Sequence, residues 1–304
     1  MPSIAANPTV AVVGAGAIGA FFAAHLIDAG RCKVLCCVRT PFDELVVESE
    51  RWEVTLRSRP EVLDDPAAAA GPVDWVLLAT KAHQTAGAAG WLSALVGPTT
   101  AVVVLQNGVE QSQRVRPFLP ATTPVLPGIV YAGVEMVAPG HGVHRTNGYV
   151  EIPAGPEADR LAELFEGAHP GVLRAVGDIT TSAWTKLLGN LSTNGITALT
   201  GRRMDVVSDP RIRDLIRRIV GEAVAVGRAE GARIGDDATE ALLAHLDRFP
   251  TAAGTSMLYD REAGRRMEED ALYGAVVRAG RRHGLQTPAN ATILALLGAI
   301  SAAS

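Results

Sequence analysis

The segment WTKLLGNLSTN (184–194) places one lysine and two asparagines at steps of four residues: Lys186, Asn190 and Asn194. Because a helix turns by about 100° per residue, this spacing predicts that the three polar side chains share one side of a helix. The apolar residues between them fall on the opposite arc. A lysine could protonate a reacting oxygen, and two amides could orient a substrate. The alternative is a solvated helix face without a function.

The residue types favour chemistry over solvation. Of the 28 basic residues only three are lysines, Lys33, Lys81 and Lys186, so the chain uses arginine for ordinary surface charge. Lysine can shift its pKa and exchange a proton near neutral pH, whereas arginine stays protonated. Asparagine is scarce in this chain, and it is a mediocre helix former because its amide competes with the backbone. Two asparagines within one helix therefore need a reason.

A second group of polar residues lies in TSMLYDREAGRRMEEDALYGAVV (255–277). Ser256 is expected near the start of a helix, where free backbone N–H groups suit a carboxylate. Glu268 is expected to open the next helix. An acidic residue in a first turn also complements the helix dipole, so a structural role for Glu268 stays open.

Three glycines in TVAVVGAGAIGAFFAAHLIDAG (9–30) have the spacing of a dinucleotide-binding loop: Gly14, Gly16 and Gly19. The pattern is informative here because an apolar strand precedes it and a helix follows. Gly14 permits a tight turn, Gly16 lets the backbone approach a pyrophosphate, and Gly19 allows close packing of helix and strand. We therefore expect the loop to bind the cofactor through Gly14, Ala15, Gly16, Ala17, Ile18 and Gly19. A glycine-rich turn without a ligand is the alternative.

The next expected strand indicates which dinucleotide is bound. No acidic residue lies between Asp28 and Asp43, where an NAD site usually holds the ribose hydroxyl. Arg39 stands there instead, and an arginine can pair with a 2′-phosphate through charge-assisted hydrogen bonds. The sequence thus favours NADP(H). Alternatively, Arg39 stacks on adenine or faces solvent.

Two more polar residues directly follow expected strands. Lys81 follows the strand at 74–79, and Asn107 follows the strand at 101–105. Ligands of open α/β sheets bind beyond the carboxyl ends of the strands, so both residues are expected at the cofactor cleft. A turn role is the alternative for Asn107, since Asn-Gly is a common turn pair.

Short apolar runs alternate with helical segments as far as about residue 176. Strands are expected at 9–13, 32–38, 74–79, 101–105, 125–137, 142–146 and 149–153, with helices at 17–29 and 84–96. This pattern is typical of a parallel sheet covered on both faces, and residues 125–153 are expected to extend that sheet as an antiparallel portion. Only helices are expected afterwards, at about 181–198, 210–230, 236–247, 254–263, 268–283 and 288–302. We predict an α/β Rossmann-type dinucleotide-binding domain at 1–177 and an all-α substrate domain at 178–304.

Composition excludes several functional classes. A net charge of −4 argues against a nucleic-acid-binding surface. No apolar run reaches the roughly 18 residues of a membrane span, and the start MPSIAANPTV lacks the basic and apolar regions of a signal peptide. Cys32, Cys36 and Cys37 have no histidine at ligand spacing, so no metal site is expected. We expect a cytoplasmic enzyme that acts on a small molecule, with a homodimer as the candidate assembly.

Together these motifs, in this order, resemble the ketopantoate reductases (2-dehydropantoate 2-reductases) over nearly the whole chain. The matching stretches are GAGAIG, Arg39, KAHQ, LQNG, PGHGVH, WTKLLGNLSTNGITALTG and the Ser256–Glu268 segment. The resemblance implies NADPH-dependent reduction of ketopantoate to pantoate, a step towards pantothenate and coenzyme A.

The resemblance also implies a role for each matching residue. Lys186 would be the general acid, and Asn190, Asn194 and Ser256 would bind the substrate. Asn107 would lie by both nicotinamide and substrate, and Glu268 would bond to cofactor or substrate at the reacting end. Arg39 and Lys81 would contact the cofactor.

Departures from the family pattern leave alternatives open. Tyr259 stands where the family usually has Gln, Met267 where Thr usually precedes the glutamate, and Met204 near a position that is Asn in some members. The chain could therefore reduce another bulky 2-keto acid. A β-hydroxyacid dehydrogenase also carries Lys and Asn four residues apart, but it has a glycine-rich approach to the lysine that this chain lacks. A non-catalytic NADP(H) sensor would not need Lys186 and Glu268.

Overall fold

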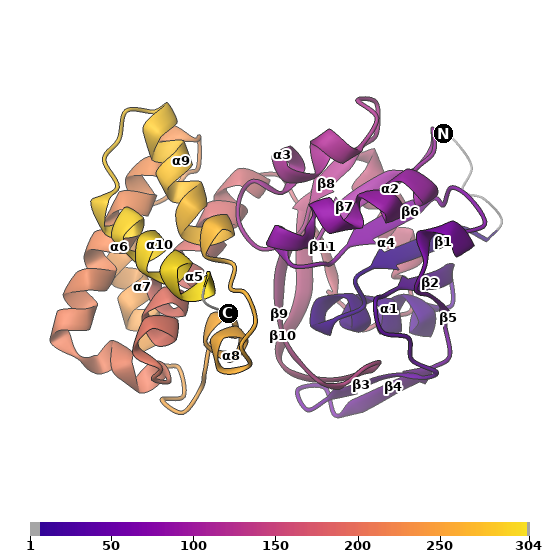
Figure 1. Ribbon diagram of the computed structural model, residues 1–304, viewed down its shortest axis with the longest axis horizontal. Coiled ribbons are helices and arrows are strands. Elements are labelled where there is room, and N and C mark those ends of the chain that lie inside the picture. Colours follow the sequence, from indigo (N-terminus) through magenta and orange to yellow (C-terminus); the bar gives the residue numbers. More distant parts are fainter. Residues whose placement is uncertain (1–6, 303–304) are drawn as a thin grey trace. The chain divides into compact units, whose positions relative to one another are not determined.

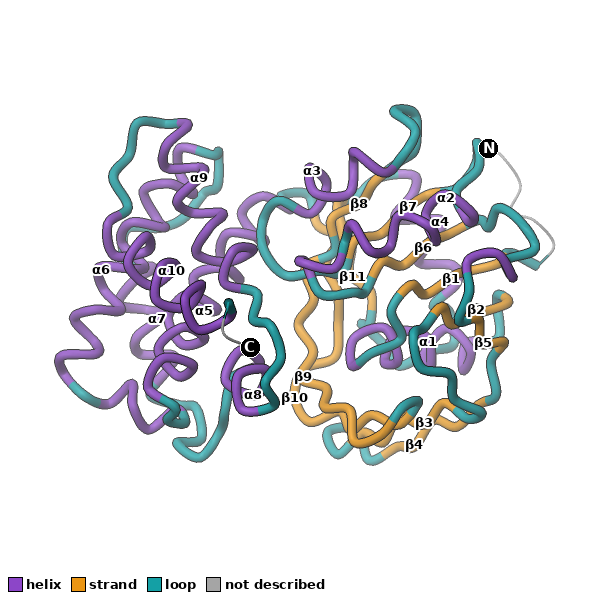
Figure 2. The backbone as a smooth tube through the Cα atoms, viewed as in Figure 1, coloured by secondary structure: helices purple, strands orange, loops and turns teal. Residues whose placement is uncertain are grey.

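The computed structural model describes residues 7–302 and divides into two compact units. Unit 1 comprises the chain as far as Gln106 together with Gln111–Ile179, and unit 2 comprises Asn107–Glu110 together with the chain from Thr180. Figure 2 shows strands in unit 1, whereas the described part of unit 2 consists of helices and loops. Residues 1–6, on which the expectation of no signal peptide partly rests, lie outside the described residues.

The first sheet of unit 1 has six parallel strands in the order β5-β2-β1-β6-β7-β8. These strands are β1 (Thr9–Val13), β2 (Lys33–Cys37), β5 (Glu61–Leu63), β6 (Trp75–Leu78), β7 (Ala101–Val104) and β8 (Val125–Pro127). Numbered along the chain within this sheet, the order is 3-2-1-4-5-6, the arrangement of dinucleotide-binding Rossmann folds. The predicted fold class is confirmed.

Both faces of this sheet are buried, as its continuous apolar runs predicted. In β1, Val10 and Val12 pack into the core on one face, while Ala11 and Val13 pack into the core on the other. The first face is covered by α1 (Ala17–Ala29) and α4 (Pro156–Leu164), and the second by α2 (Ala89–Leu95) and α3 (Gln111–Val115) (Figure 1). The cysteines Cys36 and Cys37 are buried in β2, where they pack as small apolar residues.

A second, five-stranded sheet corrects one expectation. It contains β3 (Leu45–Ser49), β4 (Val54–Ser58), β9 (Ile129–Ala138), β10 (His141–Pro153) and β11 (Leu173–Val176). The single strand expected at 125–137 is instead divided at Gly128, with β8 parallel to β7 in the first sheet and β9 antiparallel to β10 in the second. Residues 125–153 therefore do not extend the first sheet in antiparallel fashion. A Cβ on Gly128 would lie 2.8 Å from Leu105 Cδ2, so glycine lets the chain leave the sheet close to the end of β7.

The helix after the glycine loop packs against both sheets. Helix α1 contacts β1 and β2 of the first sheet, and β3, β4, β9 and β10 of the second. Its residues are buried from Gly19 to Leu26, which explains why AIGAFFAAHLIDA is apolar on nearly every side. This packing fixes the N-terminus of α1 beside the glycine loop.

Unit 2 is built around the long helix α5 (Ile179–Thr200). The other helices are α6 (Pro210–Ala229), α7 (Ala238–Leu246), α8 (Ser256–Glu262), α9 (Ala275–Arg282) and α10 (Pro288–Ser301). Trp184 and Leu191 of α5 are buried in the core of the unit, and Gly227 of α6 leaves room for the Trp184 ring. One expected helix, 268–283, differs: it begins with a π-helical segment, Asp270–Gly274, hereafter the π turn. Within the described residues no helix is both long and apolar enough to cross a membrane.

Candidate active site

The glycine loop of unit 1 has the geometry that a dinucleotide requires. Gly14 adopts φ +92°, a left-handed conformation that glycine tolerates, and its N–H donates to the Cys37 carbonyl at 2.8 Å. A Cβ on Gly19 would overlap the Gly14 carbonyl oxygen, so the loop packs directly on α1. A Cβ on Gly16, in contrast, would meet no atom within 4 Å. The space above Gly16, at the N-terminus of a 13-residue helix, suits a pyrophosphate.

Arg39 and Lys81 lie in unit 1 beyond the carboxyl ends of β2 and β6, the two strands that flank β1. Arg39 is exposed, two residues after β2, and Lys81 follows β6 by three residues. The loop around Lys81 is held by Gln106, whose amide donates to Thr80 Oγ1 at 3.1 Å and to Thr85 Oγ1 at 2.9 Å. Both cations thus follow the carboxyl ends of the strands on either side of β1, the edge at which open α/β sheets bind ligands.

In unit 2, α5 carries the three polar residues with the spacing noted in the sequence. Asn194 is buried, whereas Lys186 and Asn190 are half-buried, so the stripe is not a freely solvated face. On the opposite arc Trp184, Leu187 and Leu191 are buried in the unit 2 core. The predicted division between a polar and an apolar side is therefore observed at Lys186 and Asn190, whereas every residue of α5 from Leu191 to Ala198 is buried.

A hydrogen-bonded chain connects three of the predicted site residues. Lys186 Nζ donates to Asn107 Oδ1 at 3.4 Å, and Asn107 Nδ2 donates to Glu268 Oε2 at 3.0 Å. The Asn107–Glu110 segment belongs to unit 2, which explains how Asn107, after a strand of unit 1, bonds to residues 79 and 161 positions later. Each of the three residues was predicted from the sequence, but their connection was not.

Burial lowers the pKa of Lys186 from its usual value to about 8, and the negative charge of Glu268 partly opposes this shift. An ammonium group with such a pKa is mostly protonated at neutral pH, yet it releases its proton far more readily than an ordinary lysine. These are the properties of a general acid.

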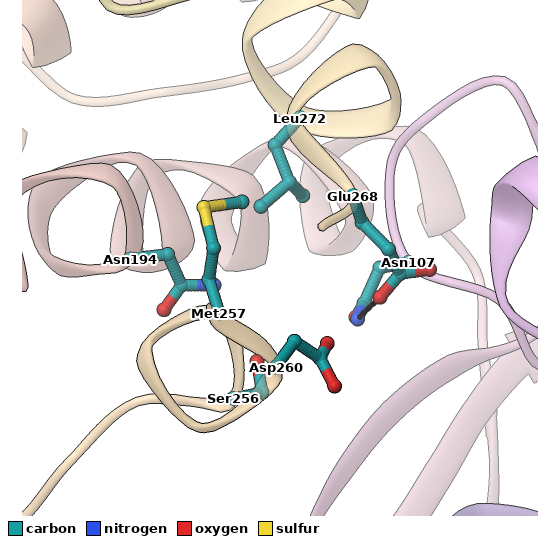
Figure 3. A pocket seen from close by; sticks show the side chains of 7 residues that line it. All are labelled: Asn107, Asn194, Ser256, Met257, Asp260, Glu268 and Leu272. Carbon is teal, nitrogen blue, oxygen red and sulfur yellow. Dashed lines mark hydrogen bonds between the residues drawn. The ribbon is translucent and has the colours of Figure 1, made fainter. Parts of the chain in front are cut away.

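A pocket in unit 2 brings most of the substrate-side residues together (Figure 3). It is lined by Asn107, Asn194, Ser256, Met257, Asp260, Glu268 and Leu272. Ser256 is the first residue of α8, and the preceding Thr255 caps this helix by accepting the N–H of Leu258. Thr255 also bonds to Thr197 of α5 at 2.7 Å, which ties the start of α8 to the helix of the two asparagines.

The structure adds residues that the sequence reasoning missed. Asp260 lines the pocket one helical turn after Ser256, is 4% exposed, and accepts a hydrogen bond from Arg265 at 2.9 Å. Its spacing of four residues from Ser256 was a signal that could have identified it. The apolar Met257 and Leu272 carried no such signal, because a core role and a lining role need the same residue types.

The three residues that depart from the family pattern lie in different environments. Met267 and Met204 are buried in the unit 2 core. Tyr259 is 46% exposed, and its hydroxyl accepts the Gly254 N–H at 3.1 Å. None of the three is among the residues that line the pocket. Among the described residues, no group of three or more His, Cys, Asp or Glu side chains could hold a metal ion.

Comparison with known proteins identifies the family. A family model described as ketopantoate reductase PanE/ApbA matches residues 10–157, and the model of its C-terminal domain matches residues 178–301. A 2-dehydropantoate 2-reductase from Caulobacter vibrioides is 41% identical over 294 residues, which cover 96% of this chain and 98% of the relative.

Solved structures agree with this result. A PanE/ApbA family ketopantoate reductase from Ralstonia eutropha superimposes with a TM-score of 0.87 at 29% identity, over 96% of this chain and 98% of that one. A dimeric ketopantoate reductase from Staphylococcus aureus gives a TM-score of 0.85 at 23% identity over the same shares, which supports the fold alone. With both family models matched in order along one chain, and a close relative over nearly its full length, this protein belongs to the ketopantoate reductase family of oxidoreductases.

Proposed function

We propose that this enzyme reduces 2-dehydropantoate to pantoate with NADPH. The observation that carries the proposal is the hydrogen-bonded chain Lys186–Asn107–Glu268, in which Asn107 and Glu268 line a pocket together with Asn194 and Ser256. It combines a lysine of lowered pKa with neutral donors that can hold a carboxylate and a keto oxygen. The family of the chain and the name of its Caulobacter relative support the same reaction.

The residues of unit 1 fit the cofactor. The backbone N–H groups at the start of α1 would hold the pyrophosphate over Gly16, where a Cβ would meet nothing. Arg39, after β2, would pair with the 2′-phosphate. Lys81, after β6, would also contact the cofactor. Bound NADPH supplies the hydride.

The residues of unit 2 would supply the rest of the reaction. Reduction of the keto carbon leaves negative charge on its oxygen, and Lys186 would donate a proton to that oxygen. Asn190, Asn194 and Ser256 would bind the substrate's oxygens and hold the keto group in place. Asn107 would lie beside the reacting atoms. Glu268 would also have a catalytic role. Its carboxylate would accept the hydrogen bond of the Asn107 amide, and its negative charge would favour the protonated form of Lys186.

The organisation of the molecule belongs to the same proposal. Residues 1–177 would form the NADP(H)-binding domain and residues 178–304 the catalytic domain, with Asn107–Glu110 contributing to the latter. We also propose a homodimer, by analogy with the Staphylococcus aureus enzyme, which light scattering would test. A cytoplasmic location, expected of a biosynthetic reductase that uses NADPH, would be checked by cell fractionation.

A panel of 2-keto acids tests the substrate. We expect NADPH oxidation with 2-dehydropantoate at a kcat/KM at least ten times that for 2-keto acids that lack its hydroxymethyl group or carry an aryl group. A tenfold preference for another bulky 2-keto acid would instead favour the second candidate. Oxidation of β-hydroxyacids in preference to 2-hydroxyacids would indicate a β-hydroxyacid dehydrogenase. A protein that binds NADPH but reduces none of the acids would be a sensor.

Arg39→Ala tests the cofactor. It is expected to weaken NADPH binding by about 10- to 100-fold, because a hydrogen bond to a charged group contributes about 1.5–3 kcal/mol and each 1.36 kcal/mol is about one decade. NADH binding should change little, since NADH lacks the 2′-phosphate. Fluorescence titration of both nucleotides gives the ratio, with Arg31→Ala, an exposed arginine paired with Glu166, as the control. Equal losses for NADPH and NADH would refute the assignment.

A further inference from the structure

Tyr273, in the π turn, makes a contact with α5 that none of the assigned site residues requires. Its side chain is fully buried, and its hydroxyl donates to the Leu191 carbonyl at 2.7 Å. The same oxygen accepts the Gly195 N–H at 3.0 Å. Burial raises the pKa of the Tyr273 phenol above its usual range, so the hydroxyl keeps the proton that it donates. Tyr273 is not among the residues that line the pocket.

The two groups that the hydroxyl contacts are natural partners in a helix. In a regular α-helix the N–H of residue i donates to the carbonyl of residue i−4, which here pairs Gly195 with Leu191. The phenol oxygen bonds to both members of this pair, so it bridges one turn of α5. A side chain that enters the backbone ladder in this way is a recognised cause of helix bending.

That turn of α5 is the one between the two substrate-side amides. Asn190 directly precedes Leu191, and Asn194 directly precedes Gly195. The geometry of the bridged turn therefore sets how far apart the two amides lie and how they point. Lys186 lies one turn earlier on the same face, so its direction relative to Asn194 depends on the same turn.

The absence of a side chain at Gly195 makes room for the Tyr273 hydroxyl. A Cβ at this position would overlap the Tyr273 hydroxyl and would lie 2.8 Å from the ring carbon Cζ that bears it. The Tyr273 hydroxyl thus lies closer to the backbone of α5 than any residue other than glycine at position 195 would allow. A glycine within a helix destabilises it by about 1 kcal/mol relative to alanine. The close approach of the Tyr273 hydroxyl explains why position 195 is nevertheless a glycine.

The π turn also holds the Asn107–Glu110 segment. A Cβ on Gly108, at φ +100°, would overlap the Ala271 carbonyl oxygen, so the segment lies directly on the π turn. Arg278 binds Glu110 through two hydrogen bonds, at 3.2 and 2.6 Å, and donates to the Asp270 carbonyl at 3.0 Å. π-Helical segments recur at functional sites because one extra residue redirects the side chains around it.

We propose that Tyr273 is a positioning residue of the reductase reaction, which sets the Lys186–Asn190–Asn194 face of α5 relative to Glu268 through its bridge between Leu191 and Gly195. The inference rests on the proposed function. The π turn that begins after Glu268 carries both the phenol that reaches α5 and the backbone that supports Asn107. A shift in this turn displaces the donors on both sides of the substrate, and displacements of about 1 Å can cost about 100-fold in rate.

Tyr273→Phe tests the proposal because it removes a single oxygen. We expect kcat/KM for 2-dehydropantoate to fall about 10- to 100-fold, with KM for the keto acid raised at least fivefold and kcat lowered as well. The dissociation constant for NADPH should stay within twofold of wild type. A purely structural role would lower the melting temperature and leave both kinetic constants of the folded enzyme unchanged.

Ser192→Ala is the matched control. Ser192 is a fully buried hydroxyl of the same helix, but it donates to Gly189 within α5 at 2.7 Å, and within residues 7–302 its hydroxyl makes no bond to another element. Its kinetic constants should stay within twofold of wild type. If Tyr273→Phe also stays within twofold while the wild type turns over, the positioning role is overturned and the proposed function stands. An inactive wild type overturns both.

A second variant covers the case in which Tyr273→Phe does not fold. Replacement of Tyr273 by 4-aminophenylalanine keeps a donor and an acceptor at the same place, and it should restore kcat/KM to within about fivefold of wild type. Where Tyr273→Phe folds and is slowed, a folded 4-amino variant that restores the kinetic constants of wild type supports the bridge. A folded 4-amino variant with kcat/KM lowered 100-fold contradicts it, because the bridge would then be present without its effect.

Discussion

Lys186→Ala is expected to lower kcat for the keto acid by about 10²–10⁴-fold, the contribution of a well-placed general acid. This corresponds to about 3–5 kcal/mol at 1.36 kcal/mol per decade. The physical reason is that the oxygen of the reduced carbonyl carries negative charge in the transition state, and alanine can neither protonate nor neutralise it. NADPH binding should survive, because the glycine loop, Arg39 and Lys81 belong to unit 1.

Lys186→Arg tests whether the reaction needs a proton from position 186 or only a positive charge there. Arginine keeps a cation at this position but cannot release its proton near neutral pH. Wild-type kcat should fall as pH rises through about 8, the pKa of Lys186, because the acid must hold its proton to donate it. The arginine variant should be slower at neutral pH and should lose this fall, which a pH profile of kcat would show.

Lys33→Ala is the matched control for both variants. Lys33 is one of the two other lysines and forms an exposed ion pair with Glu61 at 2.6 Å, so its removal should leave kcat within twofold of wild type. A Lys186→Ala enzyme whose kcat lay within threefold of wild type would remove the lysine from the role of acid.

Local sequence signals were sufficient for most of the fold. The glycine loop between an apolar strand and a helix predicted β1 and α1, and the polar stripe on an apolar helix predicted α5. These signals depend on residues close together in the chain. The signal failed at Gly128, where one apolar run supplies strands to two different sheets. Nothing local distinguishes a glycine at a turn from a glycine at a crossing between sheets.

In the candidate site, too, local sequence identified individual residues but not the long-range contacts between them. Lys186, Asn107 and Glu268 were each predicted from their own segment, but their hydrogen-bonded chain depends on Asn107–Glu110 packing with unit 2. The π turn was predicted as part of an ordinary helix, because a five-residue segment is too short for a one-residue insertion to be recognised from its apolar spacing. Tyr273 was read as part of that helix, because a buried tyrosine and its long-range backbone partners require the tertiary structure.

Glu268→Ala is expected to lower kcat/KM by about 10- to 100-fold. The carboxylate accepts the Asn107 amide at 3.0 Å, and a hydrogen bond to a charged group contributes about 1.5–3 kcal/mol. Alanine leaves the Asn107 amide without this acceptor and takes away the negative charge that raises the pKa of Lys186.

Glu268→Gln isolates the charge, because its amide oxygen can still accept the Asn107 N–H. The negative charge of Glu268 raises the pKa of Lys186, so its loss lowers that pKa further. The acid must be protonated to act, and therefore the fall of kcat with rising pH should move to lower pH by about one unit. Glu262→Gln, an exposed carboxylate of α8 paired with Arg203, removes the same charge at a distance and should leave the profile unchanged. A Glu268→Gln profile that coincides with wild type would mean that the carboxylate does not act on the lysine through its charge.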